Sequence, residues 1–165
     1  MATPPVIIHT GVEPMPEPPM ILEETEIKII ESAISSTEKL GTNIRNIFRD
    51  NSNESTHDIT WEVEAAVEAL DVFASRWTIE ILAALYIAGE RRFNELRRLL
   101  VGISSRTLSD KLTYLREFGF VNRIVVDGPP VKVTYCLTDH GIRAGRLLSP
   151  LVAYMKLKNG SIEKL

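Results

Sequence analysis

The stretch RFNELRRLLVGISSRTLSDKLTYLREFGFVNRIVVDGPPVKVTY, from Arg92 to Tyr135, contains the patterns that decide the fold. Within it, apolar residues recur at steps of four, three and three, at Leu108, Leu112, Leu115 and Phe118. In a helix over about 105–118, this spacing forms one apolar stripe that must be buried. We expect Ser104 to cap the start of this helix and Gly119 to end it.

The opposite side of the same helix is polar and is expected to face solvent. Its members are Arg106, Asp110, Thr113 and Glu117, with Ser109 and Arg116 on the flank. Upstream, Phe93, Leu96 and Leu100 keep helical spacing, and Gly102 closes that helix shortly before the next one begins. Two helices joined by so short a turn form a helix-turn-helix, whose second helix reads the major groove of DNA.

Two β-branched runs downstream predict a hairpin. They cover residues 121–126 and 131–137, and the segment between them, Asp127-Gly128-Pro129-Pro130, has turn composition. A hairpin in this place is a wing. We therefore predict a mainly α fold with a small β-hairpin: a winged helix-turn-helix domain with extra N-terminal and C-terminal helices.

Composition and charge set wider limits. The chain has 165 residues, of which 44% are apolar and 25% charged, as in an ordinary globular protein. Residues 1–75 hold 14 acidic and 4 basic side chains, whereas residues 76–165 hold 15 basic and 8 acidic ones. The net charge of −3 thus conceals a basic half that carries the helix-turn-helix, which favours contact with phosphates over a merely solvated surface.

The chain divides into five segments. We predict a flexible Pro-rich tail at 1–20, an acidic helical extension at 21–50, a linker at 51–58, the winged helix-turn-helix domain at 59–141 and a C-terminal helix at 142–165. No apolar run is long enough to span a bilayer, and no signal-peptide pattern opens the chain. We expect a cytoplasmic protein without membrane contact.

Helical patterns also flank the central stretch. The extension carries a narrow apolar stripe at Ile27, Ile30, Ile34, Ile44 and Phe48, interrupted near Thr37 and Gly41, so that one helix or two would fit. Such a stripe either pairs with a second copy, which we favour, or folds back on its own domain. Residues 62–74 are amphipathic, and residues 77–88 are apolar on nearly every face, as in a helix buried at the centre of the domain.

The C-terminal segment offers a second surface for self-association. Thr138 is expected to cap a helix, and Pro150 either starts a new helix or kinks a continuous one. The apolar positions that follow are Leu151, Val152, Tyr154, Met155 and Leu157. Together with the extension, this segment is a candidate dimer interface.

Several ordered motifs resemble the HxlR-type winged helix-turn-helix transcriptional regulators over about residues 67–141. These motifs are Arg76-Trp77-Thr78 before an Ile-Leu helix, Arg-Phe-Asn-Glu-Leu-Arg-Arg at 92–98, Gly102-Ile103-Ser104, the Leu-Ser-x-x-Leu-x-x-Leu pattern at 108–115, Pro129-Pro130, and Tyr-x-Leu-Thr-x-x-Gly at 135–141. The resemblance implies a homodimer that binds a roughly palindromic operator. Many members carry a sensor Cys-Pro before the first domain helix, but here Glu62-Val63-Glu64-Ala65 stands in that neighbourhood.

Catalytic and metal-binding chemistry find little support. His9, His57 and His140 lie at no ligand spacing with one another or with the single cysteine, Cys136, and there is no glycine-rich phosphate loop. We predict a protein that is not an enzyme and that needs no cofactor or metal. Cys136 is expected to be inert rather than oxidation-sensitive, although both behaviours fit an isolated cysteine.

Two functions remain. The first is sequence-specific binding of double-stranded DNA by a homodimeric regulator whose effector is unknown; the second is a winged-helix protein-interaction module, because the same fold serves as a docking domain. Basic and hydroxyl side chains on the exposed helix face and the hairpin favour DNA, while Asp110 and Glu117 count against it. The predicted DNA-binding residues are Ser105, Arg106, Ser109, Asp110, Thr113, Arg123 and Lys132.

Overall fold

A computed structural model of the chain describes residues 18–51 and 59–165. In chain order its elements are β1 Met20–Leu22, α1 Glu24–Asn51, α2 Ile59–Leu70, the 3₁₀ helix η1 Asp71–Phe73, α3 Arg76–Ala88, β2 Arg91–Arg92, α4 Phe93–Leu99, α5 Ser105–Glu117, β3 Val121–Val126, β4 Lys132–Leu137, α6 Asp139–Lys158 and β5 Ile162–Lys164. The mainly helical fold with a small hairpin is confirmed. Most of the expected Pro-rich tail and linker lies outside the described residues.

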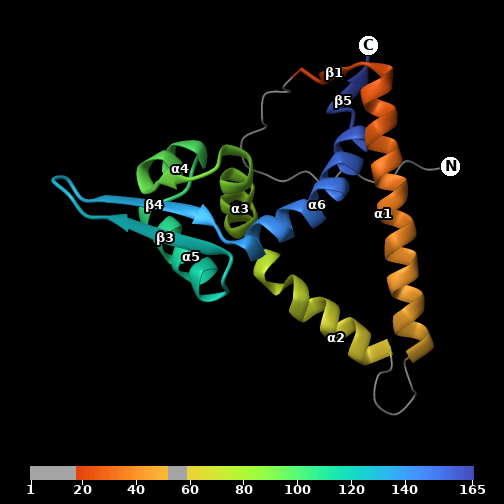
Figure 1. Cartoon of the computed structure of the whole chain (residues 1–165), viewed down its shortest axis with the longest axis horizontal. Coiled ribbons are helices and arrows are strands. Elements are labelled where there is room, and N and C mark those ends of the chain that lie inside the picture. Colours follow the sequence, from red (N-terminus) through yellow and green to blue (C-terminus); the bar gives the residue numbers. More distant parts are fainter. Residues whose placement is uncertain (1–17, 52–58) are drawn as a thin grey trace.

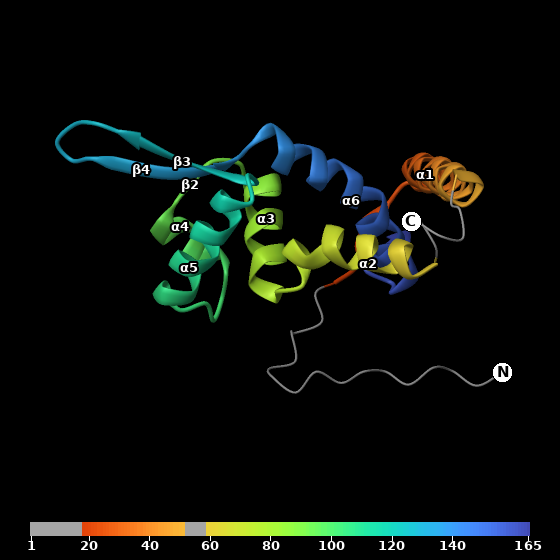
Figure 2. The ribbon, with the colours of Figure 1, turned by 90° about the horizontal axis from the view of Figure 1, so that it is seen from below.

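The hairpin and α1 lie at opposite ends of the molecule, with α3, α6 and α2 between them (Figures 1 and 2). The helices α3, α4 and α5 and the base of the hairpin surround one core. Its fully buried members include Ile81 from α3, Leu96 from α4, and Leu108, Leu112 and Leu115 from α5. The stripe found in the sequence therefore packs as predicted in its first three positions.

Phe118 was expected to complete that stripe, and this prediction is wrong. Its side chain is 51% exposed and lies against the Tyr114 ring, with the two ring centroids 4.4 Å apart. Helix α5 ends at Glu117 with Phe118 as its C-cap, and the positive φ of 74° at Gly119 turns the chain, so that Phe120 enters the core instead. The end of the helix, and not its period, decides which phenylalanine is buried.

A three-stranded sheet in the order β2-β4-β3 forms the wing. Strands β3 and β4 pair antiparallel from Val121 opposite Leu137 to Val126 opposite Lys132, as the two β-branched runs predict. The short strand β2 pairs with β4 through Arg91 and Arg92. The sequence did not indicate β2, because two arginines carry no strand period and only the neighbouring β4 makes them extended.

The junction between the wing and α6 fixes the end of α5. The Thr138 hydroxyl donates a hydrogen bond to the Gly119 carbonyl at 2.6 Å and accepts one from the Gly141 amide at 3.0 Å, which confirms Thr138 as the helix cap. Helix α6 then continues through Pro150 to Lys158, so the continuous alternative holds. At Gly141, an added Cβ would collide with the Phe120 carbonyl oxygen, which shows how closely α6 approaches the start of β3.

The N-terminal extension is one helix, because α1 runs for 28 residues through Thr37 and Gly41 without a break. It contacts α6, and the adjacent strands β1 and β5 pair in parallel, with Met20 opposite Ile162. The Lys164 ammonium lies 3.0 Å from the Glu24 carboxylate, and this contact, followed by that with Lys28, lowers the pKa of Glu24. The extension thus folds back on its own chain at its N-terminal end, while Ile44 and Phe48 remain about half exposed.

Two other helices bury less than their sequences suggest. Helix α2 has no buried residue, and its apolar side chains Val63, Val67 and Leu70 are each more than half exposed. Helix α3 was expected to be buried at the centre, but it buries one face only: Thr78, Ile81, Leu82 and Leu85 are buried, whereas Ile79 and Ile87 face outward. Apolar surface is therefore left over around α2, α3 and α6.

Replacing Leu112 with alanine is expected to lower the free energy of unfolding by about 2 to 5 kcal/mol, because it leaves a cavity among side chains that cannot fully collapse. Phe118→Ala, at the C-terminal end of the same helix, is the comparison. It should lower the free energy of unfolding by about 1 kcal/mol or less, since only the contact of an exposed ring is lost. Urea denaturation followed by circular dichroism measures both. Equal losses would contradict the packing described here.

Candidate nucleic-acid interface

Helix α5 presents a continuous polar face to solvent, because its buried leucines fix its rotation. All five residues predicted to read DNA from this helix are exposed: Ser105, Arg106, Ser109, Asp110 and Thr113. The structure therefore brings them together on one surface. No apolar side chain of the core reaches this face, so it is available to a polar partner.

The N-terminus of α5 is fixed by two hydrogen bonds. The Ser104 hydroxyl accepts a hydrogen bond from the Thr107 amide at 3.0 Å, which confirms Ser104 as the N-cap. From α4, the Arg97 guanidinium donates a hydrogen bond to the Ser105 hydroxyl at 2.9 Å. Arg97 thus adds a cation beside the start of α5. Sequence reasoning missed it, because its helical position alone does not show that it reaches the next helix.

Arg106 is a highly exposed cation of this face, with 93% of its side chain open to solvent. Its Nε lies 4.0 Å from the Asp110 carboxylate, one turn further along the helix. An ion pair between groups so exposed contributes little to stability, and it is easily exchanged for another anion or acceptor. Asp110 therefore orients Arg106 loosely and does not sequester it.

A groove of about 360 Å³ runs between the C-terminal half of α5 and strand β3. Its lining residues are Thr113, Arg116, Glu117, Val121, Asn122 and Arg123. Two arginines from two elements therefore flank one groove beside the reading face. Arg116 joins the candidate residues here, since only the placement of β3 against α5 brings it near Arg123, and Asn122 lines the groove as the chain neighbour of Arg123.

Arg123 and Lys132 are the two cations predicted to contact DNA from the hairpin, and the structure places them on opposite faces of it. Arg123 lies opposite Tyr135 and Lys132 lies opposite Val126, which is an odd number of residues, three, from Arg123 along β3. Because directly paired residues share a face and successive residues alternate, Arg123 points with Val121 toward α5 and Lys132 points away from it. Lys132 also lies near the tip, so the two cations would meet different parts of an extended partner.

The whole region from 91 to 132 is basic, with nine Arg and Lys side chains against four Asp and Glu.

Tyr114 anchors α5 to the neighbouring 3₁₀ helix. Its hydroxyl donates a hydrogen bond to the Asp71 carboxylate at 3.5 Å and so links α5 to η1. Partial burial, and then the Asp71 carboxylate, raise the pKa of Tyr114 above its ordinary value. Tyr114 therefore acts as a neutral anchor for α5 and adds no charge to the face.

Cys136 lies in β4 opposite Asn122, on the sheet face that Tyr135 and Leu137 do not occupy. Burial raises the pKa of its thiol, and the charge of Glu90 raises it further. A protonated thiol is a poor nucleophile, which favours the inert alternative.

Within residues 18–51 and 59–165, no three His, Cys, Asp or Glu side chains gather in a way that could hold a metal ion. None of the helices formed by these residues has the length and apolar character needed to cross a membrane.

The helix-turn-helix of this chain exposes the polar face of its second helix, has basic residues around that face and carries a β-hairpin beside it. These features together define a winged helix-turn-helix domain. Residues 72–161 match the HxlR-like helix-turn-helix family, which is more than half of the chain. The chain therefore belongs to the HxlR-like helix-turn-helix family of transcriptional regulators. This result confirms the resemblance recognised in the sequence motifs.

Individual relatives agree with this assignment. The chain is 37% identical over 90 residues to the uncharacterized HTH-type transcriptional regulator YtfH of Escherichia coli, which covers 54% of this chain and 71% of YtfH. It is 41% identical over 87 residues to YybR of Bacillus subtilis, which covers 53% of this chain and 66% of YybR. The crystal structure of the HTH-type regulator ytcD has a TM-score of 0.52 at 34% identity and covers 58% of this chain and 94% of ytcD.

Proposed function

We propose that this protein regulates transcription as a homodimer that binds specific sites in double-stranded DNA. In this proposal, α5 enters the major groove and the 121–137 hairpin acts as the wing. The observation that supports the proposal is the exposed polar face of α5, which is surrounded by basic side chains. A recognition helix needs both properties, because base edges are read by hydrogen bonds while phosphates attract the surrounding cations.

Within the face, we assign base contacts to the N-terminal half of α5 and phosphate contacts to its neighbours. Recognition helices contact bases mainly from their N-terminal residues, where Ser105, Arg106, Ser109, Asp110 and Thr113 are exposed. Arg106 has the free reach and the planar fork for a bidentate contact with guanine. Arg97 and Arg123 flank the helix, and Lys132 would meet backbone or minor groove from the wing tip.

The dimer is proposed from apolar surface that this chain leaves uncovered. Large apolar side chains are exposed on α1, α2 and α6, at Leu40, Ile44, Ile47, Phe48, Val63, Val67, Leu70, Leu147 and Leu151. Single-chain proteins seldom expose large apolar patches, whereas a homodimer covers about 800 Å² on each partner. We propose that the 21–50 extension and the 142–165 segment form this interface, joined by α2.

Salt dependence tests the proposed DNA binding. If a dimer neutralises on the order of 6 to 10 phosphates, its affinity for operator DNA should fall by roughly 10³ to 10⁵ between 50 and 200 mM salt. Fluorescence anisotropy with a duplex selected from a random library measures this slope. A flat dependence, or no DNA binding at low salt, would instead support a protein-interaction module.

Two substitutions separate base reading from phosphate contact. Arg106→Ala should weaken operator binding by about 1 to 3 kcal/mol and relax preference at one base position per half-site. Lys132→Ala should weaken binding to all sequences and reduce the salt slope by about one unit per site. Should Arg106→Ala weaken operator and random DNA equally, base reading would have to pass to Ser109, Asp110 and Thr113.

The dimer interface is tested by placing a carboxylate on it. Ile44→Asp in α1 and Leu151→Asp in α6 should each weaken dimerisation about tenfold or more, because an unpaired charge would be buried between the partners. Val101→Asp is the control, since Val101 is equally apolar and 82% exposed but lies in the turn between α4 and α5. Sedimentation equilibrium gives the three dissociation constants. Equal values for all three variants and the unaltered chain would place the interface elsewhere.

A further inference from the structure

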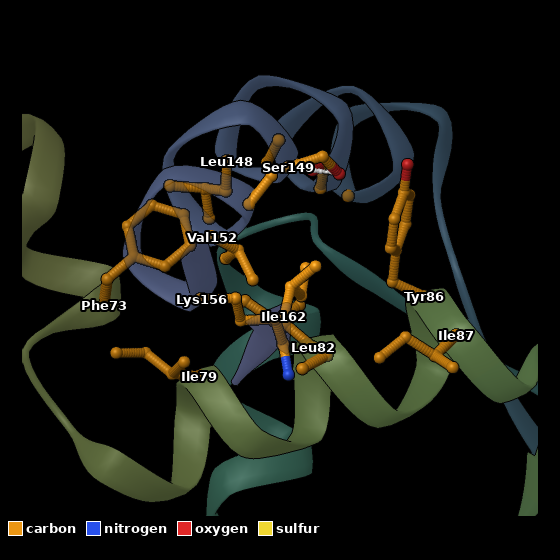
Figure 3. A pocket seen from close by; sticks show the side chains of 15 residues that line it. Phe73, Ile79, Leu82, Tyr86, Ile87, Leu148, Ser149, Val152, Lys156 and Ile162 are labelled. Carbon is orange, nitrogen blue, oxygen red and sulfur yellow. Dashed lines mark hydrogen bonds between the residues drawn. The ribbon is translucent and has the colours of Figure 1, made fainter. Parts of the chain in front are cut away.

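A half-open cavity of about 330 Å³ lies between α3 and α6, on the side of α3 that faces away from α5. Figure 3 shows Tyr86 and Ile87 at one end of the cavity, Phe73 and Ile79 at the other, and Val152 extending from α6 toward α3. The exposed face of α3, which should have been buried if this helix were central, is one wall. The cavity thus accounts for much of the apolar surface that α3 leaves uncovered.

Close contact at one end of the two helices leaves the rest of the cavity open. An added Cβ at Gly145 would lie 2.5 Å from the Tyr86 ring, so α6 rests almost directly on that ring. Beyond this contact, the space is lined by the side chains of Leu82, Leu148 and Val152. The glycine and the ring hold the helices together at this end, and no described side chain fills the remaining volume.

The lining is apolar apart from a few polar groups, of which Lys156 carries the only charge. The Ser149 hydroxyl is already engaged, since it donates a hydrogen bond to the Gly145 carbonyl at 2.9 Å. Lys156 projects from α6 toward α3 in Figure 3, and its ammonium forms no ion pair or side-chain hydrogen bond with any residue in the described parts of the chain. Lys156 is exposed to solvent as well as lining the cavity, so an apolar ligand held in the cavity can place a negative group beside its ammonium.

The volume limits the size of that ligand. Ligand sites in proteins commonly begin at about 300 Å³, and a dry cavity of about 150 Å³ holds benzene. A cavity of about 330 Å³ therefore suits a body of two fused rings or a short branched chain. A protein helix would not fit within it as a whole and could insert only side chains.

We propose that the α3–α6 cavity binds a small apolar carboxylic acid, with its hydrocarbon body between the helices and its carboxylate on Lys156. Binding would tie α6, which carries part of the proposed dimer surface, to α3, whose opposite face packs under α5. The ligand would thereby adjust the spacing of the two reading helices of a dimer. This last consequence rests on the proposed DNA-binding function, whereas the binding itself does not.

Isothermal titration calorimetry on the full chain tests the binding, with naphthoate as the acid and naphthalenemethanol as its neutral analogue. We expect saturable naphthoate binding that is about fivefold tighter than binding of the alcohol. Lys156→Met should remove this preference and leave the affinity for the alcohol unchanged. Lys158→Met is the matched control, because Lys158 lies two residues further along α6 and does not line the cavity; it should preserve the preference.

Filling the cavity gives an independent outcome. Ala83 lies on the α3 wall and is exposed, so Ala83→Trp should fold normally and abolish binding of both compounds. Circular dichroism verifies folding; if the variant fails to fold, the Lys156 comparison decides. Absence of saturable binding, or a naphthoate preference that survives Lys156→Met, would overturn the proposal.

A change of dimerisation in Ala83→Trp, without any binding of naphthoate to the unaltered chain, would show that a second copy occupies the cavity, and this too would overturn the proposal. DNA affinity is measured separately on the same samples. Saturable naphthoate binding by a chain that binds no DNA would support the cavity site and refute only the proposed function.

Discussion

The burial of Leu108, Leu112 and Leu115 is the constraint on which the rest of the structure depends. These side chains lie at or near zero exposure in the same core as Ile81 and Leu85 of α3, so α5 has only one rotation that avoids exposing them. That rotation turns the polar side of α5, including Arg106, Ser109 and Thr113, outward at once. The reading face is therefore a consequence of core packing, and changes on it leave the fold largely untouched.

Helix α6 transmits the position of this core to the rest of the molecule. Thr138 attaches its start to the end of α5, and Gly141 and Gly145 allow it to approach β3 and Tyr86 without a side chain in between. From there α6 runs to α1 and β5, so one continuous helix joins the helix-turn-helix and the wing to the outer helices. In the proposed dimer, this helix would link the two copies of α5 to whatever binds along its length.

The apolar surface left over by the single chain divides into two kinds. On α1, α2 and the outer side of α6 it is spread over exposed helix faces, which suits a second copy. Between α3 and α6 it is concave and bordered by the exposed ammonium of Lys156, which suits a small acid. The two surfaces are similarly apolar, and their shape and charge therefore distinguish the proposed dimer interface from the proposed ligand cavity.

The sequence by itself determined the elements whose signals are local. Helical period and caps located α5, glycines marked the ends of α3 and α5, and β-branched runs located β3 and β4, because each depends on residues a few positions apart. Tertiary structure decided the features that depend on distant partners: the exposure of Phe118, strand β2, the parallel pairing of β1 with β5, the opposite facing of Arg123 and Lys132, and the reach of Arg97 to Ser105. The α3–α6 cavity belongs to this second group. The sequence pattern of an apolar helix face is the same whether a neighbouring helix covers that face or leaves a cavity beside it.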